Sequence, residues 1–238
     1  MSIGDAEIKT QERVIRFFKD PEILGYQYIG NLSDYQNKNI NEDRLRQYLR
    51  LKGYADKLID AAVMQLQQEA GNLSRGVYDA NKTVYSRLKY GIPVSESPEK
   101  PPVTVELIDE ANPLNNDFAV AEEVTVVEQQ EKRPDLVIYL NGIAVAVIEL
   151  KRSSISVSEG IRQNLTNQKD SFIRGFFTTM QFCMAGNESE GLRYGTLLTG
   201  EKFYMEWKDD GFKEHEEERD PVDVRISKTC EGIDLSLI

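Results

Sequence analysis

The sequence predicts a mixed α/β domain with a central sheet, flanking helices and a helical insertion at residues 41–91. Apolar residues recur at helical spacing through this insertion, and from residue 103 onward they alternate or run together as in strands. An Asn-Gly pair, the strongest short signal for a hairpin, divides two apolar runs within residues 133–152. We therefore expect a core built from residues 1–40 and 92–238, with the helical lobe inserted into it.

Caps, breakers and changes of period set the expected limits of each element. Thr10 is a suitable cap for a first helix that ends before Pro21, Asn41 caps the first helix of the lobe, and Ser-Val-Ser-Glu at 156–159 is a capping box. The predicted helices are 10–19, 41–53, 56–71, 77–90 and 157–170. The predicted strands are 26–29, 103–108, 118–127, 178–184, 194–199 and 203–207, with two more around Asn141-Gly142. Residues 93–102 are expected to form a linker, and residues 208–220 a charged, solvated turn.

The composition excludes several classes of protein. No run of about eighteen apolar residues is present and the N-terminus has no apolar signal-peptide core, so we expect no membrane helix and no secretory leader. Cys183 and Cys230 lie far apart without metal-ligand spacing, and the single histidine, His215, lies in an acidic run. We therefore expect two ordinary thiols in a reducing cytoplasm, and neither a zinc site nor a histidine-based triad.

The net charge of −11 argues against a protein that binds nucleic acid by itself. Residues 1–100 carry 15 Lys and Arg against 14 Asp and Glu, whereas residues 101–238 carry 14 against 26. A protein that relied on phosphate contacts alone would not be this acidic. If the chain acts on DNA, other domains or partners must supply much of the binding.

Three polar residues lie at the ends of the two apolar strands in 133–152. Asp135, Glu149 and Lys151 form the pattern Pro-Asp, thirteen residues, Glu-Leu-Lys. Two carboxylates at adjoining strand ends suit Mg²⁺, which prefers oxygen ligands and lowers the pKa of a bound water, while Lys151 would orient that water beside a phosphate. The pattern predicts a metal-dependent DNA-cleaving site. Glu-x-Lys alone is not specific, since it occurs twice elsewhere in the chain. The alternative is therefore a charged strand end where the sheet reaches solvent.

The hairpin must bring Asp135 to the same face as Glu149 and Lys151. In a regular ladder, a two-residue turn at 141–142 would put Asp135 on the opposite face. A three-residue loop at 140–142 would place all three side chains on one face. We therefore predict the three-residue loop, or else a bulge nearer the site.

Three further side chains are candidates for this site. Gln163, on the helix after the hairpin, could orient the lysine or contact DNA, or could be an ordinary exposed glutamine. Glu12, on the first helix, could be a third carboxylate near the metal, and Glu42 is a weaker alternative. Most glutamates on the surface of a helix have no such role.

Several segments of the chain resemble a known family. RPDLVIYLNGIAVAVIELKR looks like the nuclease core of the restriction (R) subunits of type I restriction enzymes, and SVSEGIRQNL and EGLRYGTLLTGEKFYMEW agree. The lobe, with GYADKLIDAAVMQLQQEAG and GVYDANKTVYSRLKYG, is also similar to that family. The resemblance runs from about Thr10 to Trp207, and its motifs are specific in combination.

The resemblance implies the PD-(D/E)xK restriction-endonuclease fold, with Asp135 and Glu149 as metal ligands and Lys151 as the catalytic lysine. The family often has Gln-x-x-x-Tyr on the next helix; Gln163 matches it, but Asn167 stands where tyrosine is usual. In the family an ATP-driven translocase follows, and the intact subunit cuts double-stranded DNA when joined to methyltransferase and specificity subunits. This chain has no G-x-x-x-x-G-K-[ST] phosphate loop. We therefore expect an N-terminal fragment, with ATP bound only by the absent motor.

We accordingly predict Mg²⁺-assisted hydrolysis of a DNA phosphodiester by an activated water, without base preference in this domain. Two alternatives stay open. One is a non-catalytic docking module for the partner subunits or the motor, which the acidic surface and the absent tyrosine favour. The other is a solitary DNA repair or recombination nuclease built on the same core.

Overall fold

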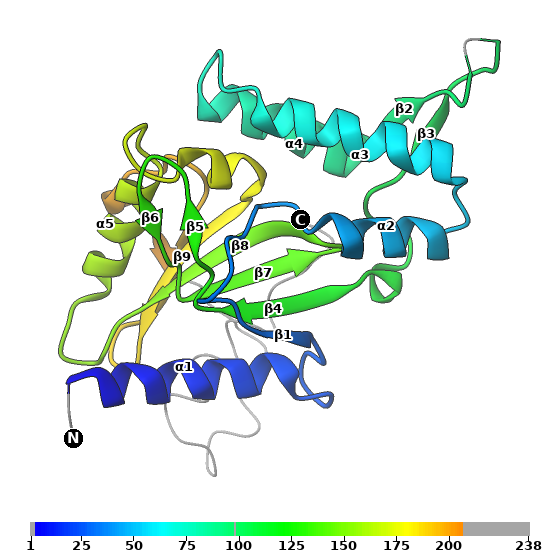
Figure 1. The fold of residues 1–238 in the computed structure, drawn as a ribbon. Helices are drawn as coiled ribbons and strands as arrows, with labels where there is room; N and C mark the ends of the chain where they lie inside the picture. The colour runs from blue at the N-terminus through cyan, green and yellow to red at the C-terminus, as the bar shows by residue number, and fades with distance from the viewer. Residues whose placement is uncertain (1–2, 98, 207–238) are drawn as a thin grey trace.

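The computed structural model describes residues 3–97 and 99–206, which form a mixed sheet covered by helices on both faces (Figure 1). The predicted class of fold, an α/β restriction-endonuclease-like sheet with helices around it, is confirmed. Seven strands lie in the order β1 (Gln27–Asn31), β4 (Phe118–Glu122), β7 (Leu136–Leu140), β8 (Ile143–Leu150), β9 (Phe182–Asn187), β10 (Gly191–Gly195) and β11 (Met205–Glu206). β1 runs parallel to β4 and β8 parallel to β9, while the other neighbours are antiparallel.

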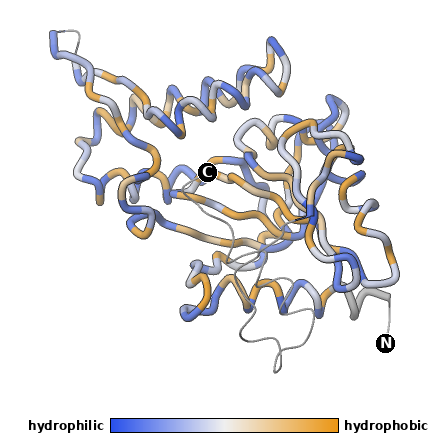
Figure 2. The backbone as a smooth tube through the Cα atoms, turned by 180° about the vertical axis from the view of Figure 1, so that it is seen from behind, coloured by the Kyte–Doolittle hydropathy of each residue, from blue (hydrophilic) through white to orange (hydrophobic). Residues whose placement is uncertain are grey.

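Each face of the sheet has its own cover. Helix α1 (Ile3–Lys19) packs on one face, where Phe18 shares a core with Leu136 and Ile148. The 3₁₀ helix η2 (Arg174–Thr179) packs on the other face, where Phe177 shares a second core with Val147. Helix α5 (Val157–Asn167) contacts β8 and β9. Figure 2 shows the hydrophobic strands enclosed between these layers. A sheet buried on both faces explains why β8 reads as a continuous apolar run.

The lobe consists of α2 (Glu42–Leu51), α3 (Asp56–Gly71) and α4 (Val77–Tyr90), followed by a hairpin of β2 (Ile92–Val94) and β3 (Val103–Val105). The predicted limits of the second and third of these helices are confirmed, as is the Asn41 cap, whose side chain accepts from Arg44 N–H. α3 and α4 lie side by side, on the far side of the sheet from α1 (Figure 1). Buried residues of both helices, including Leu66 of α3 and Leu88 of α4, nevertheless belong to the same core as α1 and the strands, whereas Val77 belongs to the second core.

Several predicted limits are wrong. α1 begins at Ile3, so Thr10 lies inside the helix and is no cap; its hydroxyl donates to Glu188 Oε1 at 3.0 Å. The predicted strand 178–184 is a strand only from Phe182, because η2 precedes it and Asn81 of α4 donates to the backbone carbonyls that would otherwise need a ladder. The remaining short elements are η1 (Pro113–Asn115), β5 (Val126–Val127), β6 (Glu131–Lys132) and η3 (Glu201–Phe203). The predictions for Trp207, the turn 208–220, His215 and Cys230 fall outside the described residues.

Candidate active site

The turn between β7 and β8 has two residues, so the predicted three-residue loop is wrong. Asn141 and Gly142 have φ angles of 52° and 82°, as a tight hairpin turn requires, and Leu140 pairs directly with Ile143. Asn141 fixes this choice, because its side chain is fully buried and hydrogen-bonded to three groups within residues 107–117. The hydrogen bonds of the buried Asn141 side chain therefore favour the two-residue turn.

The alternative prediction, a bulge nearer the site, is confirmed. Ile138 pairs with Ala146 whereas Tyr139 pairs with Ala144, so Val145 is one extra residue in β8. Val145 and Ala146 consequently both belong to the core on the α1 face, while Ala144 belongs to the core on the other face. The bulge shifts the rest of β8 by one residue relative to β7.

This shift places the two predicted carboxylates on one face. Leu136 pairs with Ile148, and one step further along the ladder Asp135 stands opposite Glu149. Directly opposed residues in an antiparallel pair have Cβ atoms about 4.5–5.5 Å apart. The face is the one covered by α5 and η2. The structure therefore brings Asp135 and Glu149 together, as the sequence pattern predicts.

Asp135 is held on both its backbone and its side chain. It lies just before β7 and is half-buried. Its Oδ2 accepts from the Leu150 N–H at 2.7 Å, and its backbone carbonyl accepts from the Glu123 N–H at 2.9 Å. Leu150 of β8 thus holds the carboxylate, and Glu123, directly after β4, holds the backbone.

Glu149 is fully buried at the end of β8, an unusual place for a carboxylate. Its Oε2 accepts from Gln163 Nε2 of α5 at 2.6 Å. α5 can approach this closely because Gly160 has no side chain: a Cβ there would lie 2.9 Å from Ala185 Cβ and 3.3 Å from the Glu149 carbonyl oxygen. Gln163 therefore orients the glutamate, whereas the sequence suggested that it orients the lysine or contacts DNA.

Lys151 follows Glu149 by two residues at the same end of the sheet. Its backbone N–H donates to Gly186 O at 2.9 Å, so the ladder with β9 continues through it, and its Nζ donates to Leu150 O at 3.1 Å. The side chain is half-buried. Alternation along the strand puts Lys151 on the same side as Glu149.

Glu12 is not brought to this site. α1 packs on the opposite face of the sheet from Asp135 and Glu149, and Glu12 is exposed on it. Within the part of the chain that the structure describes, no three His, Cys, Asp or Glu side chains form a group that could hold a metal ion. A third carboxylate from α1 therefore does not complete the pair.

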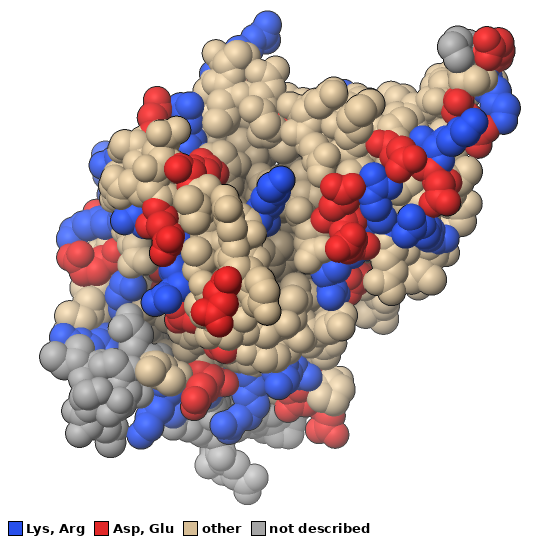
Figure 3. Space-filling view, in the orientation of Figure 1, with Lys and Arg blue, Asp and Glu red and all other residues tan. Residues whose placement is uncertain are grey.

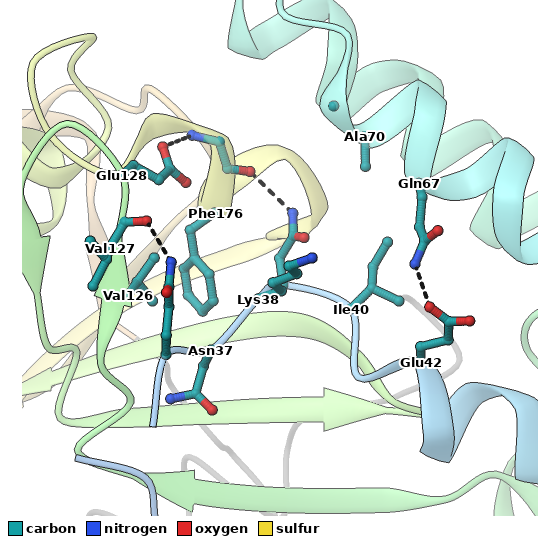
Figure 4. A pocket seen from close by; sticks show the side chains of 14 residues that line it. Asn37, Lys38, Ile40, Glu42, Gln67, Ala70, Val126, Val127, Glu128 and Phe176 are labelled. Atoms are coloured by element: carbon teal, nitrogen blue, oxygen red, sulfur yellow. Dashed lines mark hydrogen bonds between the residues drawn. The ribbon is translucent and has the colours of Figure 1, made fainter. Parts of the chain in front are cut away.

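Glu42 lies at the other end of the hairpin, in the first turn of α2, where it accepts from Arg46 and Gln67. It lines a hollow of about 540 Å³ between α3, residues 36–42 and the β5–β6 hairpin (Figures 3 and 4). Neither Asp135 nor Glu149 lines this hollow. Glu42, the weaker alternative for a third carboxylate, thus lies away from Asp135 and Glu149.

Two neighbours of the site were not predicted from the sequence. Glu123, in the left-handed region at φ 51°, hydrogen-bonds to the Asp135 backbone and pairs with Arg133 at 2.6 Å. Gln11 of α1 donates to Glu123 Oε1 at 3.3 Å. In the sequence, only the charged residues that follow β4 indicated Glu123, and charged residues are too common at strand ends to predict a site. Asn167, where the family usually has tyrosine, is buried at the end of α5.

The donor set fits a magnesium ion. Mg²⁺ is usually held by one or two carboxylates and keeps several waters, so two opposed carboxylates are sufficient. An amide holds one oxygen of each carboxylate, from Leu150 N–H and Gln163 respectively. Such contacts orient metal ligands and tune them. Asp135 and Glu149 are thus the two residues that would hold a hard divalent cation at this end of the hairpin.

Comparisons with known proteins show the family of this chain. The family model for the N terminus of the type I restriction enzyme R protein matches residues 7–203. A protein of Methanocaldococcus jannaschii named "Putative type I restriction enzyme MjaIXP endonuclease subunit" is 34% identical over 97 residues. That match covers 37% of this chain and 9% of the length of that protein.

The matched region contains Asp135, Glu149, Lys151 and Gln163, and it extends from within α1 to the end of η3. Within residues 3–97 and 99–206, no helix is both long and apolar enough to cross a bilayer. Because the family model covers most of the sequence, this chain belongs to the family of type I restriction enzyme R protein N-terminal regions.

Proposed function

We propose that this chain is the nuclease domain of a type I restriction enzyme and that it hydrolyses DNA phosphodiesters with a divalent metal ion. The observation that carries the proposal is the one-residue bulge at Val145, which sets the carboxylates of Asp135 and Glu149 opposite each other. Membership of the family supports a restriction nuclease role. The metal, the reaction and the roles of individual residues are our proposal.

In this mechanism the carboxylates of Asp135 and Glu149 would hold Mg²⁺. When bound, the ion would supply a water of lowered pKa and a positive charge beside the phosphate. Lys151 orients the attacking water and adds a second positive charge, and Gln163 holds the buried Glu149 in position. The reaction is a direct hydrolysis and forms no covalent intermediate with the protein.

The proposed substrate is double-stranded DNA, cut by the assembled enzyme with methyltransferase and specificity subunits. The match to the archaeal relative covers only 9% of that protein, so most of such a subunit lies outside the matched segment. We propose that an ATP-driven motor belongs to that remainder and that ATP is not bound by this chain. Site choice would then belong to another subunit.

Metal binding provides the first test. Titration calorimetry with Mn²⁺ on this chain should show binding to the wild type and a loss of at least tenfold in affinity for Asp135→Asn. Glu12→Gln is the matched control, because Glu12 is exposed on α1 and should leave affinity unchanged. Equal affinities for the wild type and Asp135→Asn would refute the metal site.

Cleavage provides the second test. Lys151→Ala should retain Mn²⁺ binding but reduce cleavage by the assembled enzyme by about a hundredfold or more, the usual loss when a charge-stabilising group is removed. Circular dichroism would check that the variant folds. Cleavage at the wild-type rate would favour the alternative function, a docking module whose carboxylates have no catalytic task.

A further inference from the structure

Helix α4 carries an exposed side that lies away from its buried residues. Tyr78, Lys82, Tyr85 and Lys89 are all exposed, with Tyr78 at 59% and Tyr85 at 40%. They are spaced by four, three and four residues, so they lie along one side of the helix. We call these four residues the Tyr-Lys face.

Other residues of α4 hold the helix in the molecule. Val77, Val84 and Leu88 are buried, and the Asn81 amide donates to Met180 O at 2.7 Å. α4 contacts η2 and α3 through this side. Because the buried side fixes the helix, the Tyr-Lys face is displayed on a rigid element.

Some of the positively charged residues of the lobe form ion pairs, and the others do not. Residues 41–91 carry nine Lys and Arg against six Asp and Glu, although the chain as a whole is at −11. Five of these cations pair with carboxylates: Arg44, Arg46, Arg50, Lys52 and Arg87. The four with no carboxylate in ion-pair distance among the described residues are Lys57, Arg75, Lys82 and Lys89. Three of these four lie on α4 or just before it.

We propose that the Tyr-Lys face binds the phosphate backbone of double-stranded DNA, outside the cleavage site. Lysines contact phosphates as point charges, and tyrosine hydroxyls donate hydrogen bonds to phosphate oxygens. The single acidic residue of α4, Asp79, is not one of the four, but it lies three positions before Lys82 and therefore borders the face beside that lysine. The proposal rests on DNA being the substrate, but it uses none of the residues assigned to metal binding or cleavage.

The chemistry favours DNA over a protein partner. Exposed tyrosines would suit either, because tyrosine is enriched in protein interfaces as well. Lysine is depleted in such interfaces, and burying an unpaired lysine there is costly. The four positions of the Tyr-Lys face hold two tyrosines, two lysines and no carboxylate, which instead matches a polyanion. It also provides a local binding surface on an otherwise acidic chain.

The test is the salt dependence of duplex binding with EDTA present, so that metal and cleavage play no part. Each phosphate contact contributes about 0.9 to the slope of log K against log salt. Lys82→Gln/Lys89→Gln should therefore lower that slope by about 1.8. Raising salt from 50 to 200 mM should weaken wild-type binding about tenfold more than binding of the variant. Tyr78→Phe/Tyr85→Phe should weaken binding without changing the slope.

Lys57→Gln is the matched control, since Lys57 is also exposed and unpaired among the described residues but lies on α3. It should leave the slope as in the wild type. The proposal is overturned if the wild type fails to bind duplex at 50 mM salt, if the double variant keeps the wild-type slope, or if Lys57→Gln changes it equally. Unchanged DNA binding with loss of a subunit partner would instead make the face a protein contact.

The same assay separates this proposal from the nuclease assignment. Asp135→Asn and Lys151→Ala should bind duplex with the wild-type slope in EDTA. If those variants lose neither metal binding nor cleavage while Lys82→Gln/Lys89→Gln still lowers the slope, the nuclease assignment fails and the DNA-binding face stands.

Discussion

Single hydrogen bonds decide how the candidate site is oriented. The amide of Gln163 holds the fully buried carboxylate of Glu149 at 2.6 Å, and the Leu150 N–H holds Asp135 at 2.7 Å. The sequence predicted that Asp135 and Glu149 belong together, because Pro-Asp and Glu-Leu-Lys flank a hairpin. It could not assign Gln163 to Glu149, since helical periodicity gives the side of a helix but not which side chain lies beneath it.

At this scale we predict that Gln163→Ala lowers the affinity for Mn²⁺ by about 10- to 100-fold, the usual effect of losing a partner that orients a metal ligand. Titration calorimetry would measure it. Arg162→Gln, which alters the exposed neighbour on α5, is the control and should bind as the wild type does. A Gln163→Ala variant of unchanged affinity would show that the amide has no role in positioning Glu149.

Asp109 gives a prediction for the dependence of stability on pH. Hydrogen bonds from Asn115, from Lys52 and from the Asn112 N–H hold the pKa of Asp109 at about 2, below its ordinary 3.8. A carboxylate with a lowered pKa stabilises the fold above its unfolded pKa and loses this contribution as pH falls through the folded one. The free energy of unfolding of the wild type should therefore decline more steeply between pH 4 and pH 2 than that of Asp109→Asn. Urea unfolding across this range would measure it, and parallel curves would contradict it.

Among the elements, helices were easier to predict than the register of the strands. Asp56–Gly71 and Val77–Tyr90 are as expected, because amphipathic spacing and flanking glycines mark both helices. The bulge in β8 could be proposed only as an alternative. The run IAVAVIEL is buried on both faces, so no polar and apolar alternation marks where an extra residue lies. The sequence predicts a strand at residues 178–181, because the neighbouring residues do not indicate that the distant Asn81 hydrogen-bonds to this backbone.

The contact between α5 and the sheet makes a prediction about Gly160. A methyl group there would lie 2.9 Å from Ala185 Cβ, which is closer than such atoms approach, so α5 must move away from β9. We expect Gly160→Ala to lengthen the Gln163–Glu149 contact and to weaken Mn²⁺ binding severalfold, as titration calorimetry would show.

The reciprocal change provides the control. Gly160→Ala/Ala185→Gly removes the nearest clash and should recover most of the affinity. If the double variant binds no better than Gly160→Ala, the loss does not come from this contact.

For the whole molecule, the lobe and the sheet share one hydrophobic core. Leu66 of α3 is fully buried in the cluster that also contains Phe18 of α1 and Leu136 of β7. The sequence predicted a helical insertion at 41–91, but it shows where helices lie and not what their apolar sides contact. A shared core predicts that lobe and sheet unfold together.

We therefore expect Leu66→Ala to lower the free energy of unfolding by about 2–5 kcal/mol while unfolding stays a single transition. Far- and near-ultraviolet circular dichroism should give coincident curves in urea. Met64→Ala, on the exposed side of the same helix, should change stability by about 0.5 kcal/mol or less. Two separate transitions would mean that the lobe is an independent unit.

The extra residue in β8 also constrains which length changes the hairpin can accept. Removing Val145 alone would turn the bulged ladder into a regular one, in which Tyr139 still pairs with Ala144 and Asp135 still stands opposite Glu149. With a two-residue turn, an odd number of residues between the two carboxylates needs an extra residue in one strand, whereas an even number does not. Relatives with one residue fewer here and the same turn should therefore lack the bulge, which their structures would show.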